Sequence, residues 1–216
     1  MSKDSTAVGP EHFAFIAAHT IQEDTLLREL RQAAAAAGLP EIHIASEQAA
    51  FLQIALRAAR CNDVVEVGTL GGYSAIAMAR ALGPRGRVTT LEIDPKHAAF
   101  AREWIARSDQ QGRVEVRLGD AKVTLAAMAP QSADAVFLDA DKEGYVAYLR
   151  EGMRILRPGG LLLADNVLAG GAIVDPRNRA ATPRAIRAFL EAVAAVPQLR
   201  SIIVPLGDGC LYGVKS

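Results

Sequence analysis

Short apolar segments alternate with helix-forming segments from Asp63 onward, and this alternation restricts the fold more than any other feature. The segments expected to form strands are 64–67, 87–92, 113–118, 135–139, 160–165, 199–204 and 210–215. Strands that are apolar throughout are typical of a mainly parallel sheet with helices on both faces. The sequence therefore predicts an α/β, doubly wound architecture, in which ligands bind beyond the carboxyl ends of the strands.

Start and stop signals place helices before and between these strands. Thr20 and Glu23 form a capping-box pattern, and Gly38 with Pro40 ends the helix that follows. Ser46 is expected to cap a second helix that runs to about residue 60. Further helices are expected at 73–82, at 95–107 with Asp94 as its cap, and at 145–156. Others are expected after residues 120 and 182, and a turn is expected at 157–160. Residues 1–216 are expected to form one domain.

Composition excludes several functional classes. Lys plus Arg and Asp plus Glu are balanced at 24 each, so charge favours neither nucleic acid nor an anionic membrane surface as a partner. No run of about 18 apolar residues is present, and residues 1–10 lack the apolar stretch of a signal peptide. Cys61 and Cys210 form neither a disulfide framework nor a zinc-binding spacing. We therefore expect a cytoplasmic protein that does not bind membranes.

A glycine-rich loop joins the first predicted strand to the helix that follows. It reads Gly68-x-x-Gly71-Gly72 instead of the G-x-G-x-x-G of dinucleotide-binding proteins. Glu66 would repel a pyrophosphate but could accept hydrogen bonds from an ammonium group, and Ser74 could donate to a carboxylate at the helix start. An ammonium and a carboxylate together describe the methionine end of S-adenosylmethionine. The alternative is an ordinary tight turn without a ligand.

Two further features lie at neighbouring strand ends. Glu92 ends the second predicted strand, at the distance from the glycine loop where an acidic residue accepts hydrogen bonds from ribose hydroxyls. Gly119-Asp120-Ala121 follows the third predicted strand and could form a wall for adenine. Nicotinamide-dependent enzymes share the acidic residue, and Asp120 could equally be a helix cap. Neither feature separates the two cofactor classes.

Acidic and amide side chains follow the fourth and fifth predicted strands. Asp139 ends one strand, and Asp165 with Asn166 ends the other. If these strands are neighbours about 4.8 Å apart, the three oxygen donors converge. Two crowded carboxylates repel each other unless a cation is bound, and Mg²⁺ prefers oxygen ligands. The sequence therefore predicts a divalent-metal site, with helix caps as the alternative for each residue alone.

A metal at this position would have a chemical use. A catechol could chelate it through both oxygens, and the cation would favour the phenolate, which is the nucleophile for methyl transfer. Lys142 lies three residues after Asp139 and could take the phenol proton or hold the phenolate. A solvated surface lysine is the alternative.

Five segments carry a wider pattern in a fixed order. They are Val65–Ser74, Leu91–Asp94, Gly119–Ala121, Phe137–Lys142 and Leu163–Leu168. This pattern resembles the cation-dependent class I S-adenosylmethionine O-methyltransferases, which include the caffeoyl-CoA and catechol O-methyltransferases and their bacterial relatives. The resemblance extends from about residue 42 to the C-terminus, and most other class I methyltransferases lack the metal-binding motifs.

The resemblance implies a seven-stranded sheet with an antiparallel last strand, usually in a homodimer. It implies a small catechol-like phenol as substrate, with residues 1–45 as a helical extension that contributes to the substrate pocket and the dimer surface. The metal, Mg²⁺ or alternatively Mn²⁺ or Ca²⁺, would be held by Asp139, Asp165 and Asn166, and catalysis would depend on Lys142 and Asp139. Residues implied to bind S-adenosyl-L-methionine are Ile44 through its backbone, Glu66, Gly68, Thr69, Ser74, Glu92, Ala121, Asp139 and Asp141.

Two departures place the chain nearer to the caffeoyl-CoA-like and bacterial branch than to the animal catechol enzyme. Ala140 stands where that enzyme has a histidine stacked on adenine, and the segment Asp208–Leu211 lacks its late glutamate. The N-terminal region has no basic cluster suited to a coenzyme A phosphate, which favours a free phenol. Two other functions stay open on the sequence, a nicotinamide-dependent oxidoreductase and a non-catalytic donor-binding module.

Overall fold

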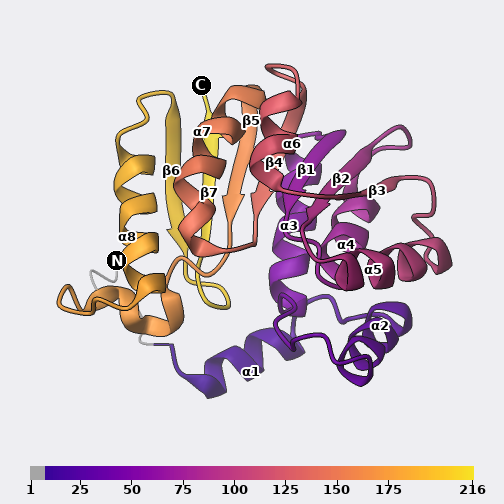
Figure 1. Cartoon of the computed structure of the whole chain (residues 1–216). Coiled ribbons are helices and arrows are strands. Elements are labelled where there is room, and N and C mark those ends of the chain that lie inside the picture. The colour runs from indigo at the N-terminus through magenta and orange to yellow at the C-terminus, as the bar shows by residue number, and fades with distance from the viewer. Residues whose placement is uncertain (1–7) are drawn as a thin grey trace.

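A seven-stranded sheet lies between two layers of helices in the computed structural model, which describes residues 8–216 (Figure 1). The order is β3-β2-β1-β4-β5-β7-β6, and only β7 runs antiparallel to its neighbours. This confirms the predicted architecture. The first seven residues, which belong to the predicted extension, lie outside the described residues. The strands are β1 (Asp63–Val67), β2 (Arg87–Glu92), β3 (Val114–Leu118), β4 (Ala133–Leu138), β5 (Leu156–Ala164), β6 (Leu199–Val204) and β7 (Cys210–Lys215).

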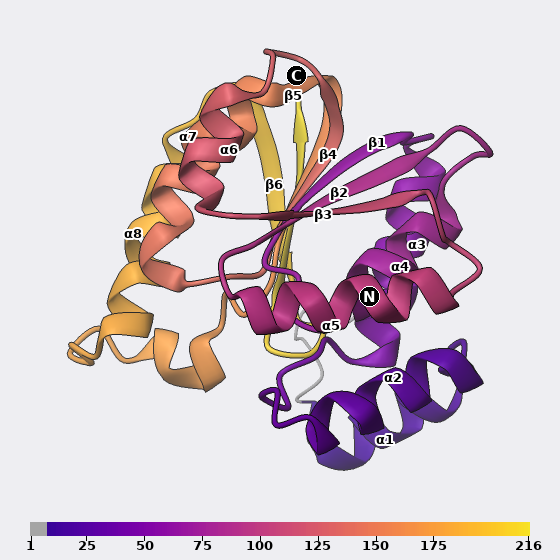
Figure 2. The same ribbon diagram turned by 45° about the vertical axis from the view of Figure 1, so that its right-hand side comes forward.

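Helices cover both faces of the sheet (Figure 2). One face carries α3 (Ser46–Ala58), α4 (Tyr73–Ala81) and α5 (Pro95–Arg107), and the other carries α6 (Ala121–Ala127), α7 (Tyr145–Ile155) and α8 (Ala181–Ala194). Successive side chains of a strand point to opposite faces. On β4, Phe137 therefore packs into the core under α3 and α4, while Val136 and Leu138 pack into the core under α7 and α8.

Several helix starts follow the predicted caps, and two do not. Asp94 and Asp120 accept hydrogen bonds from backbone N–H groups at the starts of α5 and α6, as expected. The predicted capping box at Thr20 is wrong, because α2 (Thr25–Ala36) begins after Asp24, whose side chain accepts from Leu27 N at 2.9 Å. The predicted cap at Ser46 is also wrong, since Ser46 already belongs to α3.

The predicted turn at residues 157–160 is part of a strand. β5 begins at Leu156 and continues through these residues, with a shift in its register against β4 between Ala133 and Ala135. Gly159 has a φ of 76°, a backbone conformation that glycine adopts without strain. The Pro-Gly-Gly sequence therefore produces an irregularity at the start of the strand instead of a separate turn.

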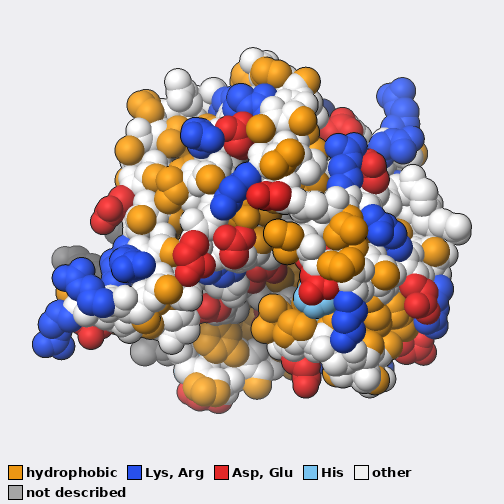
Figure 3. All heavy atoms as spheres, in the orientation of Figure 1, with side chains coloured by type: hydrophobic (Ala, Val, Ile, Leu, Met, Phe, Trp, Pro, Cys, Tyr) orange, Lys and Arg blue, Asp and Glu red, His pale blue; other side chains and the backbone are white. Residues whose placement is uncertain are grey.

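Two N-terminal helices lie beyond the carboxyl ends of the strands, where the surface is hollowed (Figures 2 and 3). α1 (Pro10–Ala18) buries no residue, whereas α2 buries Leu27, Leu30 and Ala34. In residues 8–216, no helix combines the length and the apolar character needed to cross a membrane.

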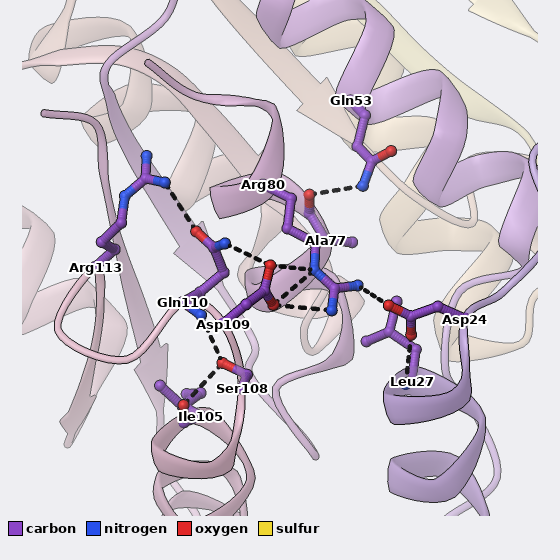
Figure 4. Close-up of polar contacts among 10 residues, drawn as sticks. All are labelled: Asp24, Leu27, Gln53, Ala77, Arg80, Ile105, Ser108, Asp109, Gln110 and Arg113. Atoms are coloured by element: carbon purple, nitrogen blue, oxygen red, sulfur yellow. Dashed lines mark hydrogen bonds and ion pairs between the residues drawn. The ribbon is translucent and has the colours of Figure 1, made fainter. Parts of the chain in front are cut away.

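Arg80 of α4 connects the start of α2 to the turn after α5 (Figure 4). Its guanidinium lies 2.8 Å from an Asp24 carboxylate oxygen and 2.9 Å from an Asp109 oxygen. The other Asp24 oxygen caps α2. One arginine therefore holds three segments together, and its side chain is only 20% exposed.

Replacing Arg80 with methionine should lower the free energy of unfolding by roughly 0.5–2 kcal/mol, because two partly exposed ion pairs are lost together. Urea denaturation measures this change. Arg150→Met is the control, since Arg150 is 80% exposed and pairs with the adjacent Glu151. Equal stability of both variants would show that the Arg80 network contributes nothing.

Candidate active site

The carboxyl ends of β1, β4 and β5 form one edge of the sheet. Val67 of β1 pairs with Leu138 of β4, and Leu138 pairs with Ala164 of β5. The next residues, Gly68, Asp139 and Asp165, therefore lie side by side at this edge, as predicted from strand adjacency. Acidic side chains surround the hollow on this face, and hydrophobic side chains line parts of its rim (Figure 3).

Two adjoining cavities lie at this edge, and they share Ile42, Gly68, Leu70 and Asp139. Between them they bring together every residue predicted to contact the methyl donor except Glu66, which lies behind them. The predicted residues on the cavity walls are Ile44, Gly68, Thr69, Ser74, Glu92, Ala121, Asp139 and Asp141.

Glu66 is fully buried below the glycine loop. Ser74 Oγ donates a hydrogen bond to Glu66 Oε1, while Oε2 has no hydrogen-bond partner among the described residues. Burial raises the pKa of this carboxyl to about 8, despite the hydrogen bond from Ser74. The contact between Glu66 and Ser74 joins two residues that the sequence assigned to the same end of the donor.

Glu92 is held in place by four backbone N–H groups. Its Oε2 accepts from Thr69 N at 3.2 Å and Leu70 N at 2.9 Å, and its Oε1 accepts from Ile93 N and Asp94 N, both at 2.9 Å. The carboxylate therefore fastens the glycine loop to the end of β2 and also lines the larger cavity.

The three predicted metal ligands directly follow β4 and β5, which are neighbouring strands. Asp165 is buried, and its Oδ1 accepts from Asn166 N at 2.7 Å and from Gln48 Nε2 at 2.8 Å. Asn166 has a φ of 58°, which turns the chain sharply after the strand. Burial raises the pKa of Asp139 to about 6, and the neighbouring Asp165 contributes to the rise.

Within residues 8–216, no group of three or more His, Cys, Asp or Glu side chains is arranged to hold a metal ion. The predicted ligand set, two carboxylates and an amide, does not depend on such a group. Its oxygens are the donor type that Mg²⁺ prefers. Asp139 and the buried Asp165 both have raised pKa values, so their negative charges are poorly stabilised by the protein and would be stabilised by a cation. The residues present therefore fit a hard divalent ion.

Lys142 lies in a short 3₁₀ turn (Lys142–Gly144) after β4. Its Nζ lies 3.5 Å from Asp139 Oδ1 and donates to Tyr145 Oη at 2.7 Å. Tyr145 Oη in turn lies 3.0 Å from Leu138 O and 3.1 Å from Asp165 O, so it can donate to either. The sequence interpretation placed Lys142 next to Asp139 correctly, but it did not predict the contact with Tyr145.

Two other contacts were missed. Tyr148 Oη donates to Asp141 Oδ1 at 2.6 Å and fixes the orientation of a predicted donor-binding carboxylate. The sequence did contain a signal for this contact. Residues three apart lie on the same side of a helix, so Tyr145 and Tyr148, at the start of the helix after Asp141, could be expected to face the strand ends together. Gln48 contacts Asp165, which lies 117 residues further along the sequence, so no local sequence pattern could predict this contact.

The sheet order, the antiparallel β7 and the glycine loop after β1 define a class I S-adenosylmethionine-dependent methyltransferase fold. A family model described as O-methyltransferase matches residues 17–215. A catechol O-methyltransferase of Mycobacterium tuberculosis is 41% identical over 174 residues, covering 81% of this chain and 79% of the relative. One of Niastella koreensis is 39% identical, covering 77% of each chain.

Solved structures agree with this assignment. An O-methyltransferase from Bacillus cereus in complex with SAH superimposes with a TM-score of 0.87 at 35% identity, covering 94% of this chain and 96% of the other. One from Streptomyces achromogenes in complex with SAM gives 0.84 at 30% identity, covering 95% and 96%. The chain belongs to the O-methyltransferase family and is an S-adenosylmethionine-dependent enzyme. The comparisons give no support to the nicotinamide-dependent alternative.

The buried Glu66 predicts a specific pH dependence of stability. Its pKa in the folded protein, about 8, lies above the ordinary value of 4.5, so stability should be lost as the pH rises from about 4.5 through 8. Glu66→Gln removes this titration and should become more stable relative to wild type over that range. Urea denaturation at pH 5, 7 and 8.5 measures the difference.

The exposed Glu103→Gln serves as the control for general effects of pH. A difference between wild type and Glu66→Gln that stays constant from pH 5 to 8.5 would contradict the raised pKa.

Proposed function

We propose that this enzyme transfers a methyl group from S-adenosylmethionine to one hydroxyl of a small catechol-like phenol, with a divalent cation, Mg²⁺, in the site. The observation that carries the proposal is that Asp139, Asp165 and Asn166 end two adjacent strands beside the cavities of the predicted donor residues. Two relatives at about 40% identity bear the name catechol O-methyltransferase, which supports the substrate class.

The cavity walls support the assignment of the donor ends. Glu66 Oε2 is a buried acceptor without a partner among the described residues, and with Ser74 it suits the amino-acid end of the donor. Glu92, held by backbone amides, suits the ribose, and Ala121 with Asp141 suits the adenine end. Ile44 borders the smaller cavity, where its backbone would contact the methionine end.

The chemistry requires one bond to form and one to break. The phenol oxygen forms a bond to the methyl carbon, the sulfonium–carbon bond breaks with its electrons going to sulfur, and the phenol proton is removed. A bound Mg²⁺ supplies a positive charge that favours the ionised phenol. The protein contributes mainly by holding the two reactants in line.

Lys142 is the residue we assign to the phenol proton. Its ammonium lies 3.5 Å from Asp139 Oδ1, and Tyr145 fixes its position through a hydrogen bond. As an ammonium it would hold the charge of the phenolate, and as a neutral amine it would accept the phenol proton. Asp139 takes part in catalysis by orienting Lys142 and by binding the cation.

We further propose that the described chain acts as one methyltransferase domain, that its N-terminal helices border the acceptor pocket, and that it works in the cytoplasm. The last point is supported by two buried cysteines with free thiols, Cys61 and Cys210. The N-terminal helices also suggest a homodimer, because α1 buries no residue in the single chain and Phe15 is 65% exposed.

Metal removal tests the function. With a panel of catechols, turnover should be lost in EDTA and return when Mg²⁺ is added in excess. Asp165→Ala should lower kcat about 100-fold or more, because the charge stabilisation from the cation is worth several kcal/mol. Its affinity for S-adenosylhomocysteine, measured by calorimetry, should stay close to wild type.

Asp63→Ala, an exposed aspartate at the opposite end of β1, is the matched control and should retain full activity. Full turnover in EDTA, or an active Asp165→Ala enzyme, would overturn the cation-dependent mechanism.

The dimer is tested by light scattering coupled to size exclusion. Wild type should have a mass of about 46 kDa, twice the 22.9 kDa of one chain. Phe15→Asp on α1 should shift this mass toward the monomer, whereas Val174→Asp, at an 81% exposed position that ends a short 3₁₀ helix, should not. A monomeric wild type would contradict the proposal.

A further inference from the structure

Gln48, in the first turn of α3, is buried and uses both ends of its side-chain amide. Its Nε2 donates to Asp165 Oδ1 at 2.8 Å, and its Oε1 accepts from Ala45 N at 3.0 Å. Only 7% of the residue is exposed. The amide therefore connects the start of α3 to the end of β5, and Ala45 is adjacent to Ile44 on the wall of the smaller cavity.

A third segment, the loop between β6 and β7, also lies against the side-chain amide of Gln48. Gly207, in the loop between β6 and β7, has a φ of 56°, and a Cβ atom built on it would lie 2.4–2.6 Å from the amide atoms of Gln48. Such a distance leaves the amide no room to move toward the loop. The two hydrogen bonds fix which end of the amide faces Asp165, because only the nitrogen can donate.

The consequence for Asp165 is an unequal use of its two oxygens. Oδ1 accepts two hydrogen bonds, from Gln48 Nε2 and Asn166 N, while Oδ2 accepts none from residues 8–216. Both donors are neutral, so the carboxylate is oriented without being neutralised. An arginine or lysine at position 48 would hold the carboxylate equally well but would compete with a cation for its charge.

We infer that Gln48 is a positioning residue for the cation, acting through Asp165. It holds Oδ1 so that Oδ2 is presented to the cation. The inference rests on the proposed cation-dependent function. Groups that hydrogen-bond to a metal ligand typically contribute 10- to 100-fold to metal affinity.

A purely structural role must be separated from this one, because Gln48 also caps α3. Gln53, on the same helix, supplies a matched control. Its Nε2 donates to Ala77 O of α4 at 2.9 Å (Figure 4), and this partner is not one of the predicted metal ligands. Gln53→Met and Gln48→Met each remove a side-chain amide from α3, but only the second removes a contact to Asp165.

The experiment measures binding of Mn²⁺ alone to the full-length protein by electron paramagnetic resonance of the free ion. Gln48→Met should bind Mn²⁺ about 10-fold more weakly than wild type. Gln53→Met should bind it as wild type does. Affinity for S-adenosylhomocysteine in EDTA should stay within about twofold in both variants. In Gln48→Asn the side-chain amide is one C–C bond too short to reach Asp165, so this variant should also bind Mn²⁺ about 10-fold more weakly than wild type. It replaces Gln48→Met if the methionine variant does not fold.

Unchanged Mn²⁺ affinity in the Gln48 variants would overturn the inference while leaving the proposed function intact. A parallel loss of Mn²⁺ and S-adenosylhomocysteine binding would also overturn it, because it would show general damage to the start of α3. A wild-type protein that binds no Mn²⁺, or binds it equally well after Asp165→Ala, would instead overturn the cation-dependent function and this inference with it.

Discussion

The close approach of the ends of β1 and β4 is the constraint on which the whole site depends. Asp139 N donates to Val67 O at 2.8 Å. This hydrogen bond between the ends of the two strands holds the backbone at Asp139 next to the glycine loop. A Cβ atom at Gly68 would lie 2.0 Å from the Asp139 carbonyl oxygen. The sequence interpretation assigned this glycine to donor binding. In the structure the neighbouring strand already requires it, so the loop and Asp139 are fixed relative to each other before any ligand binds.

The same ladder continues to β5 and holds the acidic pair together. Asp165 N donates to Leu138 O at 3.0 Å, and Tyr145 Oη lies within hydrogen-bond distance of both strand ends. Burial and mutual repulsion raise the pKa of Asp139, which is the electrostatic cost of this arrangement. The backbone hydrogen bonds and the buried tyrosine keep the carboxylates at neighbouring strand ends despite that cost. In the proposed mechanism, a rigid pair of this kind would not have to assemble around the cation.

Features that depend on local sequence patterns could be predicted from the sequence. Apolar runs and turn residues located all seven strands, and the position of Asp139 and Asp165 after two of them followed from strand adjacency. Contacts between distant segments could not be predicted this way. The interaction of Gln48 with Asp165 spans 117 residues. The cap of α2 is Asp24, which also pairs with Arg80 of another helix. The role of Tyr145 depends on two carbonyl groups that only the sheet brings together.

The placement of Lys142 is compatible with the cation that we propose for the same site. Its ammonium pairs with Asp139 but donates its shortest hydrogen bond to Tyr145 Oη. The tyrosine is buried and fixed by the strand ends, so this bond persists whichever partner Asp139 takes. A cation that draws Asp139 away would therefore leave Lys142 with a defined position beside the substrate oxygen. Without Tyr145, a flexible lysine freed from its carboxylate would lose that position. The hydroxyl that the sequence left unassigned is thus what makes the proposed proton-handling role of Lys142 compatible with a neighbouring metal.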